Sequence, residues 1–165
     1  MARAFEAERV LRLPLMAHLS TICPEGPRGT PVWFLWEEGV LWIPGDTGSH
    51  FVQRIEADPR VAVDIVEYDN AAGILQHVGL RGSAELGDTD VPARFGRVLA
   101  KYLGPDRTTW NAWFVERIAR IDDPATRMIR LVPDSIFTND VSYFRTGPDL
   151  AVPRLGPEGA EVPEK

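Results

Sequence analysis

The strongest secondary-structure signal in the chain is Thr30-Pro-Val-Trp-Phe-Leu-Trp-Glu-Glu-Gly-Val-Leu-Trp-Ile43. Its first half, residues 30–36, is rich in Val, Trp, Phe and Leu, which favour β-strands. Glu37-Glu38-Gly39 has the composition of a tight turn, and residues 40–43 form a second apolar run of strand length. Two such runs joined by a short turn that contains glycine predict a β-hairpin.

Further strands and helices are expected on both sides of this hairpin. Short apolar runs predict strands at residues 15–22, 61–66, 74–86, 127–132 and 135–138. Apolar residues at helical spacing predict helices at residues 4–13, 49–57, 90–103 and 110–121. Residues 23–29 hold two prolines and two glycines and are expected to form a loop, and Gly79 and Gly82 indicate a bulge, a bend or a close backbone approach. The pattern predicts a mainly β fold, a small β-barrel decorated by helices.

Length and composition limit the class of protein. The 165 residues are enough for one domain, and the formal charge of −6 argues against a protein that binds the nucleic-acid backbone. The single cysteine, Cys23, excludes an intrachain disulfide and a cysteine-based zinc site. No apolar run is long enough for a membrane helix, and the charged N-terminus argues against a signal peptide. We therefore expect a cytoplasmic protein with one domain over residues 1–145, followed by a Pro/Gly-rich tail over residues 146–165 that is exposed or disordered.

Gly45-Asp-Thr-Gly-Ser-His50 is the segment most suggestive of a binding site, because it follows a strand and opens a helix. The first turn of a helix leaves backbone N–H groups unpaired beside the positive end of the helix dipole. A phosphate would bind there, with Thr47 and Ser49 as hydroxyl donors. An ordinary capped helix has the same sequence pattern, so both interpretations are open at this point.

Other segments also allow both a structural and a functional interpretation. The aromatic residues of 31–36 are typical of a core or an interface, and also of a wall against a planar ring. In residues 76–82, Gly79 would permit a planar ligand to approach, and Gln76 offers an amide. Aromatic residues in the last two predicted helices either pack these helices onto the barrel or line a substrate pocket: Tyr102, Trp110, Trp113 and Phe114. The histidines are far apart in sequence, which indicates no metal site: His18, His50 and His77.

Taken in order, these segments resemble the pyridoxamine 5′-phosphate oxidase-like family. The resemblance rests on Ala17-His-Leu-Ser-Thr, Pro-Val-Trp-Phe, Thr-Gly-Ser before a helix, Asp58-Pro-Arg-Val-Ala-Val63 and Val-Gly-Leu-Arg-Gly, and it runs from about Leu15 to Leu86. It implies the split antiparallel β-barrel that binds FMN, in a homodimer with the cofactor cleft at the subunit interface. It also implies an oxidoreductase with a small-molecule substrate.

The resemblance also implies roles for individual residues. Val32, Trp33 and Phe34 would line the isoalloxazine ring, and Ile43 and Pro44 would face it from the next strand. Thr47, Ser49 and His50 would lie at the phosphate, and Gln76 would reach the flavin from a later strand, across the dimer. Many members carry an Arg-Lys pair after the serine, where this chain has His50-Phe51. Two arginines are expected to replace the missing positive charge: Arg54, one turn along the same helix face, and Arg28, in the preceding loop.

Three alternatives to FMN follow from the same resemblance. The barrel would hold a deazaflavin, or haem with His18, His50 or His77 as axial ligand. In the third alternative the protein is a non-catalytic dimeric binding or sensor module, whose degenerate flavin site is partly filled by Phe51. No pair of residues in the sequence identifies a catalytic acid or base, so none is assigned.

Overall fold

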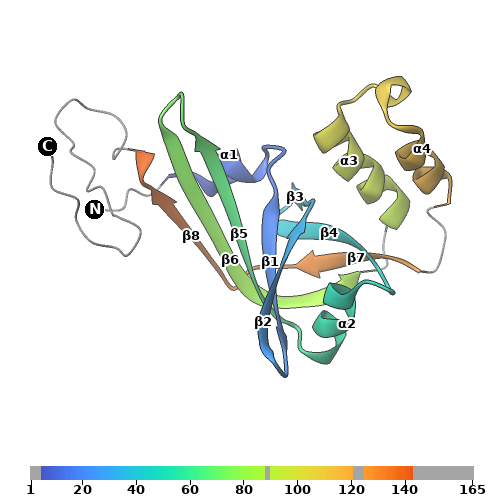
Figure 1. Cartoon of the computed structure of the whole chain (residues 1–165), viewed down its shortest axis with the longest axis horizontal. Coiled ribbons are helices and arrows are strands. Elements are labelled where there is room, and N and C mark those ends of the chain that lie inside the picture. Colours follow the sequence, from blue (N-terminus) through green and yellow to red (C-terminus); the bar gives the residue numbers. More distant parts are fainter. Residues whose placement is uncertain (1–4, 88–89, 121–124, 143–165) are drawn as a thin grey trace, which may run out of the picture.

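The computed structural model of the chain describes residues 5–87, 90–120 and 125–142 (Figure 1). The predicted tail, residues 146–165, lies outside the described residues. The strands are β1 Ala17–Cys23, β2 Gly26–Val32, β3 Leu35–Glu37, β4 Val40–Asp46, β5 Arg60–Asp69, β6 Ile74–Gly87, β7 Thr126–Leu131 and β8 Ser135–Asp140. The helices are α1 Ala7–Leu11, α2 His50–Ala57, α3 Val91–Leu103, the 3₁₀ turn η1 Arg107–Thr109 and α4 Ala112–Ala119.

The strands form one antiparallel sheet in the order β2-β1-β5-β6-β7-β4-β3, and β8 also pairs with β6. The long strand β6 belongs to both halves of this sheet, because residues 74–83 pair with β5 and residues 84–87 pair with β7. The sheet curls around a core to which every strand from β1 to β7 except β3 contributes, and α1 and α2 add Val10, Leu11, Val52 and Ile55. The expected fold, a split antiparallel β-barrel with added helices, is confirmed (Figure 1).

The predicted hairpin is confirmed, with a shorter turn than expected. Glu37 pairs with Val40, which leaves Glu38 and Gly39 as a two-residue turn. Both residues have positive φ, 52° at Glu38 and 77° at Gly39. Turns of this kind match the right-handed twist of the flanking strands, and glycine adopts the second conformation without strain.

The loop predicted at residues 23–29 is wrong for most of its length. Strand β2 begins at Gly26, and only Pro24 and Glu25 form the turn to β1. Proline removes a backbone donor, so it is normally excluded from the interior of a sheet. Strand β2 pairs only with β1 and lies at the edge of the sheet, where Pro27 and Pro31 have no second strand to bond.

The strand predicted over residues 30–36 is interrupted at Trp33 and Phe34, which separate β2 from β3. The backbone of Phe34 bonds to helix α3 instead of to a strand. Its N–H donates to the Tyr102 hydroxyl at 3.2 Å, and its carbonyl accepts from Lys101 Nζ at 3.2 Å. Apolar content alone predicts a continuous strand, because the bonds that interrupt it come from residues almost 70 positions away.

The four predicted helices are present with shorter bounds, and α2 begins at His50 as expected, after Ser49. Helix α3 packs on the β4–β7 face of the sheet, where Val98 contacts the cluster of Trp42 and Met128. Helix α4 lies beside α3 at the same end of the molecule (Figure 1). No helix among the described residues has the length and apolar character needed to cross a membrane.

The close backbone approach expected at Gly79 and Gly82 is found at Gly82, where a Cβ atom would lie 3.0 Å from the Val132 carbonyl oxygen. A Cβ atom on Gly79 would lie 2.0 Å from a ring carbon of Phe137 on β8. At Gly79 the neighbour is thus a side chain, and the absence of a Cβ atom lets the Phe137 ring pack directly on the strand.

Candidate functional site

A groove of about 240 Å³ lies between the α3–α4 pair and the junction of β4 with α2. We call it the aromatic groove. It is lined by Trp33, Pro44, Gly45, Asp46, Ser49, Phe51, Phe95, Val98, Leu99, Trp113, Phe114 and Arg117. Three residues predicted from separate parts of the sequence, Trp33, Pro44 and Ser49, meet in this groove. Two of the three predicted binding segments, residues 31–36 and 45–50, therefore meet in the folded chain.

One wall of the aromatic groove is a stack of three rings. The indole of Trp33 lies almost parallel to the ring of Tyr102, with centroids 4.6 Å apart and an interplanar angle of 3°. Phe114 of α4 stacks against Trp33 at 5.5 Å. Of the two interpretations of the aromatic residues in α3 and α4, packing therefore holds for Tyr102, while Phe114 both packs and lines the groove.

Two polar residues of α3 hold the strand break behind this wall. The Tyr102 hydroxyl donates to the Leu15 carbonyl at 2.7 Å, and burial raises the pKa of Tyr102 to about 12. Lys101 Nζ donates to the Leu11 and Phe34 carbonyls and lies 3.4 Å from the centroid of the Phe34 ring. Burial lowers the pKa of Lys101 to about 7. Helix α3 thus fixes the backbone that carries Trp33.

The turn between β4 and α2 is compact because of Gly45 and Asp46. A Cβ atom on Gly45 would lie 2.8 Å from Val52 Cγ2, so a side chain there would displace α2. The Gly48 N–H donates to Asp46 Oδ1 at 2.8 Å, and the Ser49 N–H donates to the Asp46 carbonyl at 2.8 Å. Ser49 occupies the N-cap position, but its side chain makes no capping hydrogen bond. Its hydroxyl is therefore available at the start of α2.

Helix α2 also supplies a positive charge on the side that faces β1. Arg54 Nε donates to the Thr21 hydroxyl at 2.7 Å, and a terminal nitrogen lies 3.5 Å from the Thr30 hydroxyl. Among the described residues, no carboxylate forms an ion pair with Arg54. The guanidinium is fixed by two hydroxyls and its charge is not neutralised, as an anion-binding arginine requires.

Most of the other predicted residues lie outside the aromatic groove: Arg28, Val32, Phe34, Ile43, Thr47, His50, Arg54 and Gln76. Val32, Phe34 and Ile43 are buried in the core and do not line the groove of a single chain. Thr47 is half-buried and its N–H donates to the Ala125 carbonyl at 2.9 Å, while His50 is exposed on the first turn of α2. Arg28 is exposed on β2. Phe51 forms part of the groove wall beside Gly45.

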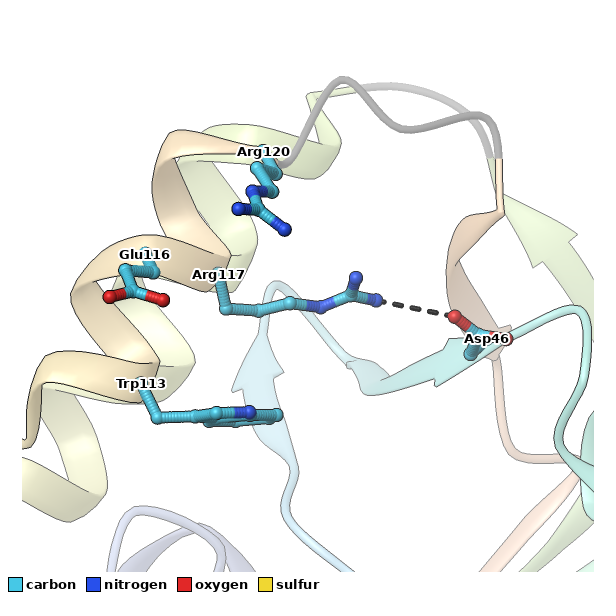
Figure 2. Close-up of a pocket in the computed structure, with 5 residues that line it drawn as sticks. All are labelled: Asp46, Trp113, Glu116, Arg117 and Arg120. Carbon is cyan, nitrogen blue, oxygen red and sulfur yellow. Dashed lines mark hydrogen bonds and ion pairs between the residues drawn. The ribbon is translucent and has the colours of Figure 1, made fainter.

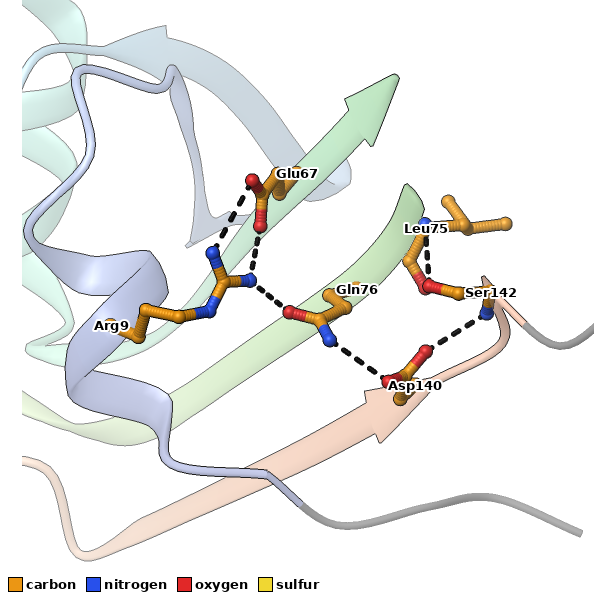
Figure 3. Close-up of polar contacts among 6 residues, drawn as sticks. All are labelled: Arg9, Glu67, Leu75, Gln76, Asp140 and Ser142. Atoms are coloured by element: carbon orange, nitrogen blue, oxygen red, sulfur yellow. Dashed lines mark hydrogen bonds and ion pairs between the residues drawn. The ribbon is translucent and has the colours of Figure 1, made fainter. Parts of the chain in front are cut away.

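Gln76 lies in a separate polar network between α1, β5, β6 and β8 (Figure 3). Its side-chain oxygen accepts from Arg9 of α1, and its nitrogen donates to Asp140 Oδ2 at 2.9 Å. Arg9 also binds Glu67, and the Ser142 N–H donates to Asp140 Oδ1. We call these residues, together with Leu75, the Gln76 network. Within one chain, the amide of Gln76 is occupied by protein partners.

The three histidines also lie apart. His18 is exposed on β1, His50 begins α2, and His77 on β6 bonds to Asp64 at 2.8 Å. No group of three or more potential metal-ligating side chains occurs in the parts of the chain that the structure describes.

Sequence reasoning missed a second, more polar space that adjoins the aromatic groove. We call it the arginine cavity; it has a volume of about 470 Å³ and is lined by Asp46, Trp113, Glu116, Arg117 and Arg120 (Figure 2). Arg117 reaches across it from α4 to Asp46, with an N–O distance of 3.3 Å. Positions 113, 117 and 120 share one face of a helix, and this spacing could have indicated that Trp113, Arg117 and Arg120 lie together. The contact with Asp46 spans 71 residues and leaves no local pattern.

One of two comparisons of the sequence with known proteins finds a match. A sequence model described as pyridoxamine 5′-phosphate oxidase matches residues 5–140. A search of curated protein sequences finds no match.

Solved structures share the fold. A conserved hypothetical protein from Mycobacterium tuberculosis aligns with a TM-score of 0.68 and 21% identity, over 84% of this chain and 86% of that one. An F420 reductase aligns with a TM-score of 0.60 and 25% identity, over 78% of this chain and 94% of that one. A FAD-binding protein from Mesorhizobium loti aligns with a TM-score of 0.60 and 16% identity, over 85% and 96%. Because the family model covers most of the barrel described above, the chain belongs to the pyridoxamine 5′-phosphate oxidase-like family.

Proposed function

We propose that the protein is an oxidoreductase that binds FMN in the aromatic groove and acts as a homodimer on a small molecule. The observation that carries this proposal is the convergence of Trp33, Pro44 and Ser49 on one groove at the start of α2. When bound, the flavin would supply transfer of a hydride or an electron pair. The residues of this chain would bind, orient and shield it.

The donor set of the groove fits a flavin mononucleotide. The wall of Trp33 and Phe114 offers aromatic surface to a planar ring, and Pro44 adds apolar surface from β4. At the other end, the first turn of α2 presents unpaired amides, and the Ser49 hydroxyl has no capping bond. Arg54 is not part of the groove lining; on the side of α2 that faces β1 it carries a positive charge that no described carboxylate neutralises, and it would take the place of the Arg-Lys pair common in the family. We place the phosphate between the start of α2 and Arg54.

The experiment is a titration of the purified protein with FMN, followed by quenching of flavin fluorescence. We expect saturable binding near 1:1, weakened about fivefold in Ser49→Ala and about tenfold or more in Arg54→Gln, since hydrogen bonds to a charged group are worth about 1–3 kcal/mol. Glu56→Gln, an exposed residue of the same helix, is the control and should bind as the wild type does. Equal affinity in all four proteins would place the phosphate elsewhere.

The homodimer is supported by the size of the groove and by an apolar surface. A volume of about 240 Å³ is small for a flavin, because pockets for ligands of that size measure about 300–1,000 Å³. A second copy would supply the missing wall. Val66, Tyr68 and Phe137 lie on one face of the sheet formed by β5, β6 and β8, and each is at least 40% exposed. Exposed apolar groups gathered on one face indicate an interaction surface.

Sedimentation measurements test the dimer. We expect a dimer for the wild type and a monomer for Val66→Lys/Tyr68→Lys, with weaker FMN binding in the monomer. If the wild type were a monomer and bound FMN at a 1:1 ratio, the dimer would be removed from the proposal.

We also propose that the protein is cytoplasmic, since the unpaired thiol of Cys23 is typical of a reducing compartment.

A deazaflavin is the second candidate cofactor, favoured by the likeness to an F420 reductase. The same groove would hold the ring, because both cofactors present a planar three-ring system to the stacking wall. Parallel titrations with FMN and F420 separate the candidates. If F420 bound tenfold more tightly than FMN, F420 would replace FMN as the proposed cofactor.

A further inference from the structure

The arginine cavity is not used by the proposed cofactor. It opens beside the aromatic groove and shares Asp46, Trp113 and Arg117 with it. Its volume of about 470 Å³ falls within the range of small-molecule sites. A molecule bound there would lie next to whatever fills the groove.

Trp113 gives the arginine cavity an aromatic floor. Its side chain is 61% exposed, which is unusual for so large an apolar group. The indole is nevertheless held in place, because Phe114 packs edge-on against it with centroids 4.9 Å apart. Figure 2 shows the indole extending below the Arg117 side chain, in the same direction across the cavity. A fixed and exposed ring of this kind offers a stacking surface to another planar ring.

Arg117 and Arg120 supply positive charge on the same side of α4. The Arg117 guanidinium bonds to Asp46, and Arg120 is exposed and has no ion-pair partner among the described residues. Figure 2 shows the guanidinium groups of Arg117 and Arg120 on the side of the helix that faces Asp46, and Glu116 also lines the cavity. Planar guanidinium groups bind carboxylates through two parallel hydrogen bonds.

Asp46 limits the charge that the cavity accepts. Its carboxylate accepts a hydrogen bond from the Gly48 N–H at 2.8 Å and lies 3.3 Å from the Arg117 guanidinium. The two arginines and the two carboxylates that line the cavity, Asp46 and Glu116, balance in formal charge, and Arg120 is the lining arginine that forms no ion pair with another described residue. A singly charged anion would pair with Arg120, and a doubly charged phosphate would be repelled more strongly by Asp46 and Glu116.

We propose that the arginine cavity binds the substrate, an aromatic carboxylic acid whose ring stacks on Trp113 and whose carboxylate bonds to Arg117 and Arg120. As a substrate site it rests on the proposed flavin function, but binding of the acid needs no cofactor and can be measured without one.

The test compares two probes of the same shape, 2-naphthoate and the neutral 2-naphthamide, by isothermal titration calorimetry with the cofactor-free wild type. We expect 2-naphthoate to bind at least tenfold more tightly than 2-naphthamide, since the neutral amide forms no charge-assisted pair with arginine. Arg117→Gln and Arg120→Gln should each weaken 2-naphthoate binding about tenfold and leave 2-naphthamide unchanged. Trp113→Leu should weaken both probes, and Arg12→Gln, an exposed arginine on α1, should change neither.

Three results would overturn the proposal: equal affinity for the two probes in the wild type, no saturable binding of 2-naphthoate at millimolar concentration, or unchanged 2-naphthoate affinity in both arginine variants. Tighter binding of 2-naphthyl phosphate than of 2-naphthoate would overturn the choice of a carboxylate. Arg120 has no described partner, so its variant keeps the test valid if Arg117→Gln folds poorly. Selective 2-naphthoate binding in a protein that does not bind FMN would contradict the proposed cofactor and leave the acid site standing.

Discussion

The Gln76 network and the arginine cavity are built from similar parts but differ in what they leave unpaired. In each, an arginine on a helix reaches a carboxylate on a strand, Arg9 to Glu67 and Arg117 to Asp46 (Figures 2 and 3). In the Gln76 network, Gln76, Asp140 and Ser142 continue the chain of bonds, so the polar groups satisfy one another. In the arginine cavity, the ion pair borders an open space with an exposed indole and a second arginine. The first arrangement stabilises the barrel, and the second is suited to a ligand.

The largest expected effect distinguishes two tryptophans that line the same groove. Trp33 is stacked between Tyr102 and Phe114, so Trp33→Ala should lower the free energy of unfolding by about 3 kcal/mol through loss of packing. Trp113 is mostly exposed, so Trp113→Ala should change it by about 0.5 kcal/mol or less. Urea denaturation measures both values. Equal losses would mean that Trp113 is a packing residue and not a stacking surface for a ligand.

A second prediction tests whether the Gln76 network is structural. Gln76→Leu leaves Arg9 and Asp140 without one partner each and should destabilise the protein by about 1–2 kcal/mol. Gln53→Leu, an exposed glutamine on α2 with one hydrogen bond, should cost less than about 0.5 kcal/mol. FMN titration of the same variants sharpens the comparison. If Gln76→Leu weakened FMN binding and left stability unchanged, Gln76 would belong to the cofactor site of a dimer, as the family resemblance implies.

A third prediction concerns pH and the back wall of the aromatic groove. The pKa of Lys101 is lowered from 10.5 in the unfolded chain to about 7 by burial. Between these pH values the unfolded chain binds more protons than the folded one, so the free energy of unfolding rises with pH across this window. Partial exposure and the two carbonyl acceptors limit the gain to about 1 kcal/mol between pH 7 and pH 9. Lys101→Met should lack this increase, and an identical increase in both proteins would assign it to other groups.

The smallest expected effect is that of the Arg117–Asp46 pair on stability. Both side chains are partly exposed, so Arg117→Gln should change the free energy of unfolding by about 0.5 kcal/mol or less. Thermal denaturation measures this change. Arg12→Gln, which removes the exposed ion pair between Arg12 and Glu8, is the matched control. A loss above about 2 kcal/mol would show that the pair holds α4 in place, as Arg9 holds the Gln76 network.

The sequence predicted most elements because their patterns are local. The hairpin over residues 35–46 and the start of α2 after Ser49 depend on turn composition and helical spacing that a single stretch of chain displays. The interruption at Trp33 and Phe34 was missed because Tyr102 and Lys101, which cause it, are distant in sequence. Strand β2 was missed because only the sheet order shows that its prolines lie at an edge.

Only part of the candidate site was predicted from the sequence, namely the wall that contains Trp33, Pro44 and Ser49. Trp33, Pro44 and Ser49 carry family-like motifs and could be named before the fold was known. Asp46 and Arg117 could not, because their roles arise from the packing of α4 against the β4–α2 junction. Gln76 carries a family-like motif as well, yet within one chain its bonds go to Arg9 and Asp140. A motif therefore identifies a residue type at a position, and the fold determines which partners it meets.

The most direct test of the central claim is a crystal structure of the protein grown with FMN. We predict that the isoalloxazine ring lies along Trp33 and Pro44, with the phosphate within hydrogen-bond distance of Ser49 Oγ and the first amides of α2. A flavin bound at another surface, or crystals grown in saturating FMN in which the groove holds only water, would contradict the assignment of the aromatic groove as the cofactor site.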